Sequence, residues 1–325
     1  MPIKKIIAVL SLVITAGANA QTFQPVGTKG LPSQRHECAA AVVNDDMFLF
    51  GGRGNRPVNR FNFKTNTWDS VAVMPMIMNH WQASVYNDEV IIAGAFTGNY
   101  PHETPIANIY AFNTKNHTWH IETTIPAVRL RGAAASVVHQ NKLYLIAGII
   151  DGHYDRHVAW VDMYDFKTKK WTQLADAPHA RDHFQAVVVN NKIYVAGGRK
   201  SSAMSKQVFQ LTVPEVDVYD IAANNWTTLD STKNIPTQRA GCTSVAFGKN
   251  AFMVIGGESG KQGMAHCEAE VFNVITQQWD IGIKLMQGRH GTQAVLYNKK
   301  IFIVAGSANK GGGPELNNME MYKVN

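Results

Sequence analysis

Arginine and histidine recur at matching distances from turn residues along this chain, and these two residue types could together bind an anion and move a proton. Arg181 lies three residues after Pro178, and His183 follows two residues later. Arginine offers forked donors that match a carboxylate or a sulfate, and histidine titrates near neutral pH, as a general acid or base must. Counting three residues from each turn proline, or from Met286, gives Arg35, Met78, Arg129, Arg181, Arg239 and Arg289.

The residues beside this first series carry the same chemistry. Two positions further on lie Glu37, His80, Arg131, His183, Gly241 and Gly291. Between the two series lie His36, Asn79, Leu130, Asp182, Ala240 and His290. A polar segment at residues 151–157, "DGHYDRH", adds His153 and Tyr154.

Two sets of candidate site residues follow from these positions. We expect His80, His183, His290 and Tyr154 to act as acids and bases. The residues that we expect to bind the substrate are Arg35, Glu37, Arg129, Arg131, Arg181, Arg239, Arg289 and His153.

The elements that must position these residues come from an internal repeat of about 50 residues. Five tryptophans recur at spacings of 51, 52, 55 and 53, and an aromatic residue lies seven positions before each. In each unit a double apolar run ends in a glycine. Six such units, each containing four short strands, are typical of propeller blades. The glycines are Gly51, Gly94, Gly148, Gly197, Gly256 and Gly306.

The two ends of the chain indicate how the ring closes. The sixth unit ends at "NMEMYKVN", on its third strand, and has no tryptophan after it. The segment "QTFQPVGTKGLPSQR" near the N-terminus matches the missing strand, with Phe23 in the tryptophan position. Because an open ring would leave bare strand edges, we predict an all-β, six-bladed propeller whose last blade is closed by the N-terminal strand.

The repeats resemble those of Kelch propellers. The residues that carry the resemblance are the runs "FLFGG", "VAGGR" and "VIGGE", the following "DMYDFKTKKW" and "DVYDIAANNW", and the spaced tryptophans. In three units Ala95, Ile149 and Ser307 replace the second glycine of the pair. The resemblance implies a β-propeller of an exported bacterial type, with the central domain of galactose oxidase and bacterial N-acetylneuraminate epimerase as distant architectural relatives. It places the two series of candidate residues around one mouth of the central channel.

An alternative for the arginines is structural. Four units carry an acid two positions before the aromatic residue, and these acids could neutralise four of the first-series arginines without any ligand. Arg131, His80, His183 and His290 vary from unit to unit and are not needed by the repeat, so they are the stronger functional candidates. The four acids are Asp162, Asp217, Glu270 and Glu320.

A metal centre is a further alternative. Glu37, His80 and His183 occupy equivalent positions, and two histidines with a carboxylate form a known non-haem metal set. Ligand atoms must, however, converge to about 2 Å from one ion, and these residues start from different sides of the channel. The ring positions contain no pair of tyrosines together with a histidine, so they do not suggest a copper site like that of galactose oxidase. We therefore expect neither a metal nor another cofactor.

The N-terminal sequence and the net charge indicate where we expect the protein to be located and what kind of ligand suits it. Residues 1–20 carry Lys4 and Lys5, an apolar stretch and then "ANA", the order of a secretory signal peptide. A retained membrane anchor is the alternative. Removing the two lysines lowers the formal net charge from +7 to +5 (7 − 2), a mildly basic balance that suits an anionic ligand. We expect one propeller over residues 21–325, monomeric and periplasmic or secreted, with no membrane span after cleavage and no nucleic-acid partner.

Two functions fit these residues. One is an enzyme acting on an acidic carbohydrate at the channel mouth, by mutarotation or epimerisation, or by β-elimination. The other is a non-catalytic module that binds a glycan or a protein partner at the same mouth, because fold does not determine function. Three histidines at one mouth favour proton transfer or a metal over simple anion capture.

Overall fold

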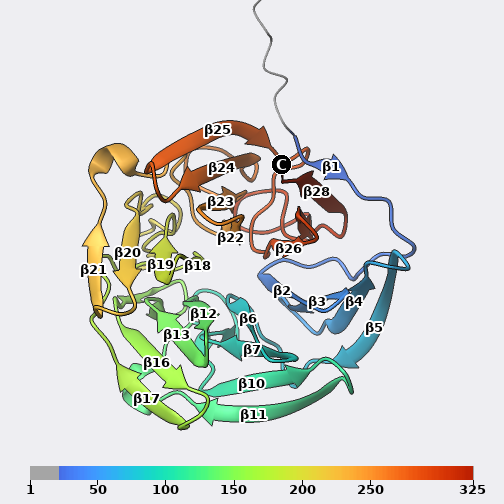
Figure 1. Ribbon diagram of the computed structural model, residues 1–325, viewed down its shortest axis with the longest axis horizontal. Helices are drawn as coiled ribbons and strands as arrows, with labels where there is room; N and C mark the ends of the chain where they lie inside the picture. The colour runs from blue at the N-terminus through green and yellow to red at the C-terminus, as the bar shows by residue number, and fades with distance from the viewer. Residues whose placement is uncertain (1–21, 325) are drawn as a thin grey trace, which may run out of the picture.

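The computed structural model describes residues 22–324, and the predicted signal peptide lies outside that range. Six four-stranded antiparallel sheets stand around a common centre (Figure 1). The described residues contain no α-helix, only the 3₁₀ turns η1 (Ala127–Arg129) and η2 (Ser231–Lys233). The predicted all-β, six-bladed propeller is therefore confirmed. No helix between residues 22 and 324 is long and apolar enough to cross a membrane.

Each blade runs outward from the central channel in chain order. Blade 1 contains β2 (Cys38–Val43), β3 (Asp46–Gly51), β4 (Pro57–Asn62) and β5 (Thr67–Val73). Blade 2 contains β6 (Gln82–Tyr86), β7 (Glu89–Ala93), β10 (Asn108–Asn113) and β11 (Thr118–Thr124). Blade 3 contains β12 (Ala135–His139), β13 (Lys142–Ile146), β16 (Val161–Asp165) and β17 (Lys170–Gln173).

The remaining blades follow the same plan. Blade 4 contains β18 (Ala186–Val189), β19 (Lys192–Val195), β20 (Asp217–Asp220) and β21 (Asn225–Thr228). Blade 5 contains β22 (Thr243–Phe247), β23 (Ala251–Ile255), β24 (Glu268–Asn273) and β25 (Gln278–Lys284). Blade 6 contains β26 (Val295–Tyr297), β27 (Lys300–Val304), β28 (Met319–Lys323) and, as its outer strand, β1 (Gln24–Pro25).

The N-terminal strand closes the ring as predicted. Gln24 pairs with Met321 on β28, so the first and last strands of the described chain share blade 6. Phe23 is fully buried, and its ring lies 5.4 Å from that of Tyr322. The backbone N–H of Phe23 also donates to the carbonyl of Lys284 in blade 5. This strand therefore joins two blades as well as completing one.

The repeated tryptophans pack within blades 1 to 5, and four of them also bond to the preceding blade. Each pairs across the two outer strands with the aromatic residue seven positions earlier, for example Trp119 with Phe112. The indole N–H of Trp119 donates to the carbonyl of Val73 in the preceding blade at 2.9 Å. Trp171, Trp226 and Trp279 make the equivalent bond. A tryptophan at this position thus supplies apolar area and a polar link between blades.

Among the described residues the core consists of six large apolar clusters, each formed between two neighbouring blades, and one small cluster of Phe96, Ala133 and Ile149. One large cluster contains Phe48 of blade 1 and Trp81 of blade 2, for example. Cys38 and Cys242 are buried in such clusters as free thiols, as expected of small apolar residues. The candidate site therefore rests on rigid, well-packed elements.

Loops that follow the second strand of each blade gather at the end of the channel where the innermost strands begin, which we call the top. Two of these loops form small hairpins. One pairs β8 (Phe96–Thr97) with β9 (Thr104–Pro105), and the other pairs β14 (Ile149–Asp151) with β15 (Asp155–His157). The loop residue Arg199 in blade 4 likewise bridges back to Asp182, just ahead of the innermost strand. These pairings bring loop side chains over the channel.

Candidate functional site

A ring of six residues surrounds the top of the channel. In every blade the third residue of the polar segment ahead of the innermost strand has a positive φ, between 47° and 65°. Glycine adopts such angles freely, but glutamate and histidine do so at a cost of about 1–3 kcal/mol, and such residues cluster at functional sites. The ring residues are Glu37, His80, Ala133, His183, Gly241 and Gly291.

The predicted alignment of the blade 3 repeat positions with those of the other blades was wrong by two residues. The turn η1 inserts two extra residues after Pro126, so that Arg131 takes the first-series position and Ala133 the ring position. Arg131 donates to the carbonyl of Ala147, sixteen residues on, as Arg181 does to that of Gly197. Arg131 is therefore a scaffold arginine rather than a ring residue.

The arginines are buried and paired within their own blades. Asp162 accepts from both Arg129 and Arg131, and Arg181 pairs with Asp217. Arg239 pairs with Glu270 and Arg289 with Glu320, while Asn59 takes the acid's place beside Arg35. The geometry thus favours a structural role over the predicted substrate-binding role. Arg35, Arg129, Arg131, Arg181, Arg239 and Arg289 are all at most 9% exposed.

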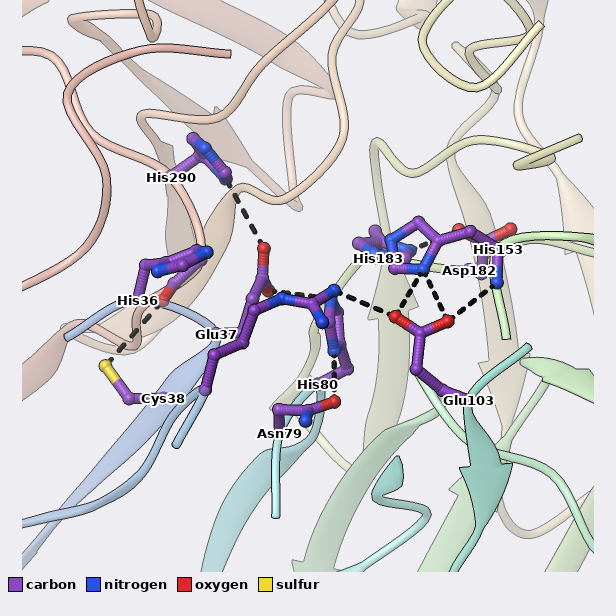
Figure 2. A network of polar contacts seen from close by, with 12 residues as sticks. His36, Glu37, Cys38, Asn79, His80, Glu103, His153, Asp182, His183 and His290 are labelled. Atoms are coloured by element: carbon purple, nitrogen blue, oxygen red, sulfur yellow. Dashed lines mark hydrogen bonds and ion pairs between the residues drawn. The ribbon is translucent and has the colours of Figure 1, made fainter. Parts of the chain in front are cut away.

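Three histidines from different blades converge above the channel (Figure 2). His80 and His183 belong to the ring, whereas His153 reaches in from the β14–β15 hairpin. Their ring centroids lie 4.6–5.0 Å apart, and one ligating atom of each lies within 4.8 Å of the others. All three are buried. We call these residues the histidine cluster.

An acceptor stands behind each imidazole and fixes its orientation. Asn79 Oδ1 lies 2.6 Å from His80 Nδ1, and Asp182 Oδ1 contacts His183 Nδ1. Both carboxylate oxygens of Glu103 lie 3.0 Å from His153 Nδ1. Because each Nδ1 faces an acceptor, the proton resides there and Nε2 carries the free lone pair. His80 Nε2 and His183 Nε2 are buried without a hydrogen-bond partner among the described residues.

Burial and charge set the protonation of these groups. Burial lowers the pKa of His80 well below its usual value, and the neighbouring His183 and His153 lower it further. The pKa of His183 is also lowered, mainly by burial and then by Arg199. Burial alone would raise the pKa of Glu103, but hydrogen bonds from His153 and Arg53 bring it to about 2. His80 and His183 are therefore neutral imidazoles at neutral pH, and Glu103 is an anionic carboxylate.

Glu37 lies beside the histidine cluster and connects it to His290. One oxygen of Glu37 is 3.3 Å from His80 Nε2, and the other is 3.7 Å from His290 Nδ1. His290 Nε2 lies 2.9 Å from the carbonyl oxygen of Asn309 and 3.5 Å from Glu258 Oε2. Of the predicted acid–base residues, His80 and His183 are brought together, whereas His290 stands apart on the far side of Glu37.

Tyr154 does not join this group. Its ring packs against the exposed His102 at a centroid distance of 4.3 Å, near the outer end of the β14–β15 hairpin. The structure thus gives Tyr154 a surface contact in place of the predicted position at the cluster.

The channel below the ring is blocked by glutamines from alternate blades. Gln82 of blade 2 exchanges two hydrogen bonds with the backbone of Ala186 in blade 4, and Gln293 of blade 6 does the same with Ala83. A cavity lined by ring residues and by Gln185 has a volume of about 40 Å³. That is room for roughly three waters, so this cavity is too small for a sugar ring.

The acceptors behind the histidine cluster were not among the candidate site residues predicted from the sequence. Asn79 and Asp182 precede His80 and His183 directly, so an acceptor followed by histidine was an available local signal. Glu103 had no such signal because its partner His153 is 50 residues away. His153 itself was predicted as a substrate ligand and instead completes the set of three imidazoles.

Comparison with known proteins agrees with this architecture. The chain is 27% identical over 303 residues to Kelch-like protein terF of Aspergillus terreus, covering 88% of this chain and 64% of that protein. It is 26% identical over 260 residues to alpha-scruin of Limulus polyphemus, covering 74% of this chain and 26% of that protein. The chain therefore spans less than two thirds of these curated relatives.

A solved structure and a family profile complete the comparison. The structure of YjhT matches with a TM-score of 0.76 at 15% identity, over 91% of this chain and 97% of that one, which shows the shared fold alone. The profile of the Attractin/LZTR1 beta-propeller family matches residues 10–266. The repeats, the six blades and this match together show that the chain is a Kelch-repeat β-propeller and belongs to the Attractin/LZTR1 beta-propeller family.

Proposed function

We propose that this Kelch propeller binds an acidic carbohydrate at the top of its channel and acts on it through Glu37 and the histidine cluster. The observation that carries the proposal is that buried imidazoles and the Glu37 carboxylate converge at the ring, where imidazole nitrogens lack hydrogen-bond partners among the described residues. The propeller fold does not require these side chains. Buried donors and acceptors without partners are costly and rare in proteins. Blades 3, 5 and 6 place alanine or glycine at the same ring position, so the imidazoles and the carboxylate serve something other than the scaffold.

The charge of the top loops supports an anionic ligand. These loops expose more cationic than anionic side chains, because their acids are largely taken up in ion pairs such as Arg53 with Glu103. Such a surface raises the local concentration of an anion. The exposed cations are Arg156, Lys200, Lys206 and Lys261.

The size of the cavity limits how the sugar binds. Only a substituent such as a carboxylate or hydroxyl group fits the 40 Å³ next to the ring, so the sugar itself lies among the loops. At neutral pH the depressed pKa of His80 keeps its imidazole in the basic form. A positioned base of this kind typically contributes about 10²–10⁴-fold, which suits mutarotation, epimerisation or β-elimination of a sugar acid.

A non-catalytic binding module is the second candidate, and the apolar residues of the same loops favour it. Tyr100, Met204 and Met264 are 54%, 56% and 71% exposed. Aromatic and methionine side chains are enriched in protein interfaces. The partner in this case is a protein that covers the loops.

A thermal-shift series on the full mature chain tests the proposal against uronate oligomers and other acidic sugars. Ligand at 100 times its dissociation constant should stabilise the protein by about 2.7 kcal/mol. His183→Gln should lose this response, and His266→Gln, a buried histidine outside the cluster, should keep it. No shift with any sugar, or an equal shift in both variants, would overturn the carbohydrate proposal and leave the protein-binding module.

A further inference from the structure

We propose that His80, His153 and His183 form a mononuclear site for a divalent transition-metal ion, with zinc as the first candidate. The inference concerns the same place as the proposed function but does not depend on the carbohydrate. It rests on four properties of the described residues: the donor geometry, the tautomers, the charge and the closure of the site.

The donor geometry is close to that of a bound ion. Two nitrogens at about 2.1 Å from one zinc ion can lie at most about 4.2 Å apart. The ligating atoms of the three histidines lie within 4.8 Å of one another. Small rotations of the rings therefore bring all three into the first coordination sphere, and three imidazoles form a known ligand set for catalytic zinc.

The tautomers are already those of metal ligands. A metal-bound histidine donates its other ring N–H to a carboxylate or carbonyl, which orients the ring and raises its basicity. Here Asn79, Glu103 and Asp182 accept from the three Nδ1 atoms. Asp182 is itself fixed, because the backbone N–H and the hydroxyl of Ser201 donate to it at 2.8 and 2.7 Å.

Two nitrogens of the histidine cluster are buried without a hydrogen-bond partner in the described part of the chain. His80 Nε2 and His183 Nε2 are fully buried and have no hydrogen-bond partner within residues 22–324. Their side chains are only 1% and 2% exposed. Nε2 of His80 faces Glu37 at 3.3 Å, but the contact does not have hydrogen-bond geometry. A metal ion would use both lone pairs at once.

The excess of negative charge around the histidine cluster favours binding of a divalent cation. Four buried carboxylates contact the cluster or its neighbours, and two guanidinium groups pair with them. The carboxylates therefore outnumber the guanidinium groups by two (4 − 2). The carboxylates are Glu37, Glu103, Asp182 and Glu258, and the guanidinium groups are Arg53 and Arg199.

The surroundings leave a position next to the site for water or a ligand group. Glu37 lies beside His80 and outside the set of three mutually close donors. A carboxylate at that place can accept a proton from a molecule bound beside the imidazoles. The glutamine plug closes the channel below, so exchange takes place from the top loops.

Metal binding by the full mature chain, purified without a polyhistidine tag, tests the inference. The protein is stripped with chelator and titrated with Co²⁺, and its visible spectrum and its zinc content after reloading are measured with no sugar present. We expect one ion per chain and an intense spectrum of low-coordinate Co²⁺. His153→Gln and His183→Gln should bind at least about 100-fold more weakly, and Asp182→Asn about 10–100-fold more weakly.

Controls make the result interpretable. His266→Gln should bind as the wild type does, and circular dichroism checks that each variant is folded. Binding of less than one ion in the folded wild type, or equal affinity in folded His153→Gln, would overturn the inference. A metal-loaded protein that ignores every acidic sugar would overturn the proposed substrate and leave the metal site intact.

Discussion

Glu37 depends on a glycine for its place beside the histidine cluster. A Cβ atom added at Gly291 would lie 2.9 Å from the Glu37 backbone nitrogen and 3.0 Å from its carboxyl group. Gly291 also has a φ of +65°, which disfavours side chains. At the residue scale, therefore, Glu37 can occupy its ring position because the neighbouring blade has a glycine at the equivalent position.

Gly291→Ala should accordingly disturb the site as well as the fold. We expect a loss of about 1–2 kcal/mol for the left-handed conformation, plus a displaced Glu37 and a weaker ligand or metal response. Gly248→Ala is the control, because Gly248 has a φ of +59° with nothing within 4 Å of the added Cβ. Chemical denaturation and metal titration of both variants measure this, and equal behaviour of the two would contradict the role given to Gly291.

His266 should make stability depend on pH. Burial lowers its pKa below the usual 6.5, and Arg239 lowers it further, against the opposing effect of Glu268. Below pH 6.5 the unfolded chain therefore binds more protons than the folded one, so this contribution is fully present above pH 6.5 and is lost as the pH falls. The slope is at most about 1.4 kcal/mol per pH unit.

Denaturation of wild type and His266→Gln between pH 7.5 and about 5 checks this prediction. The free energy of unfolding of the wild type should fall more steeply with decreasing pH than that of the variant. Parallel curves would mean that His266 keeps its ordinary pKa in the folded protein.

The sequence predicted part of the site at this scale. Equivalent repeat positions identified Glu37, His80 and His183 because the repeat fixes where such residues stand around the channel. It could not identify Glu103 or place His153, since both lie on irregular hairpins whose course depends on tertiary packing. It also placed Tyr154 too close to the channel for the same reason.

At the scale of the element, the structure of a blade explains why the first-series arginines are buried and paired. Arg289 reaches along blade 6 to Glu320 at 2.5 Å, and Glu320 also accepts the backbone N–H groups of Met286 and Gln287. The pair therefore ties the turn ahead of the innermost strand to the third strand. The sequence raised this alternative through the acid in four of the units, but two residues inserted at η1 concealed that Arg131 belongs to the same class.

Arg289→Met should destabilise the protein by about 3–5 kcal/mol, because it leaves Glu320 buried without its cation. Arg60→Met is the matched control, since Arg60 pairs with Asp69 at the surface with side chains 30% and 45% exposed. A surface pair contributes at most about 1 kcal/mol. Urea denaturation compares them, and wild-type stability of Arg289→Met would return this arginine to the candidates for ligand binding.

The whole molecule depends on closure of the ring. The fold was predictable nearly completely, because repeated tryptophans, glycine pairs and the incomplete last unit each constrain the same architecture. Phe23 illustrates this: it was predicted to take the tryptophan position of the last blade, and the structure shows it buried there against Tyr322. The loops at the top were not predictable, since their lengths and sequences differ from blade to blade.

Phe23→Ala should cost about 3–5 kcal/mol, the usual loss for a buried phenylalanine, because blade 6 loses the anchor of its outer strand. Val73→Ala, at a position that is 76% exposed on the outer strand of blade 1, should change stability little. Thermal unfolding of both variants measures the difference. A small effect of Phe23→Ala would indicate that the propeller is stable without its closing strand.

The measurement that tests the central claim most directly is an anomalous difference map from crystals of residues 21–325 grown with Zn²⁺, collected on both sides of the zinc absorption edge. We predict one strong peak at about 2.1 Å from a ring nitrogen of His80, His153 and His183. No peak there in crystals that hold zinc elsewhere, with the three rings unmoved, would contradict the claim that this cluster is the functional centre of the propeller.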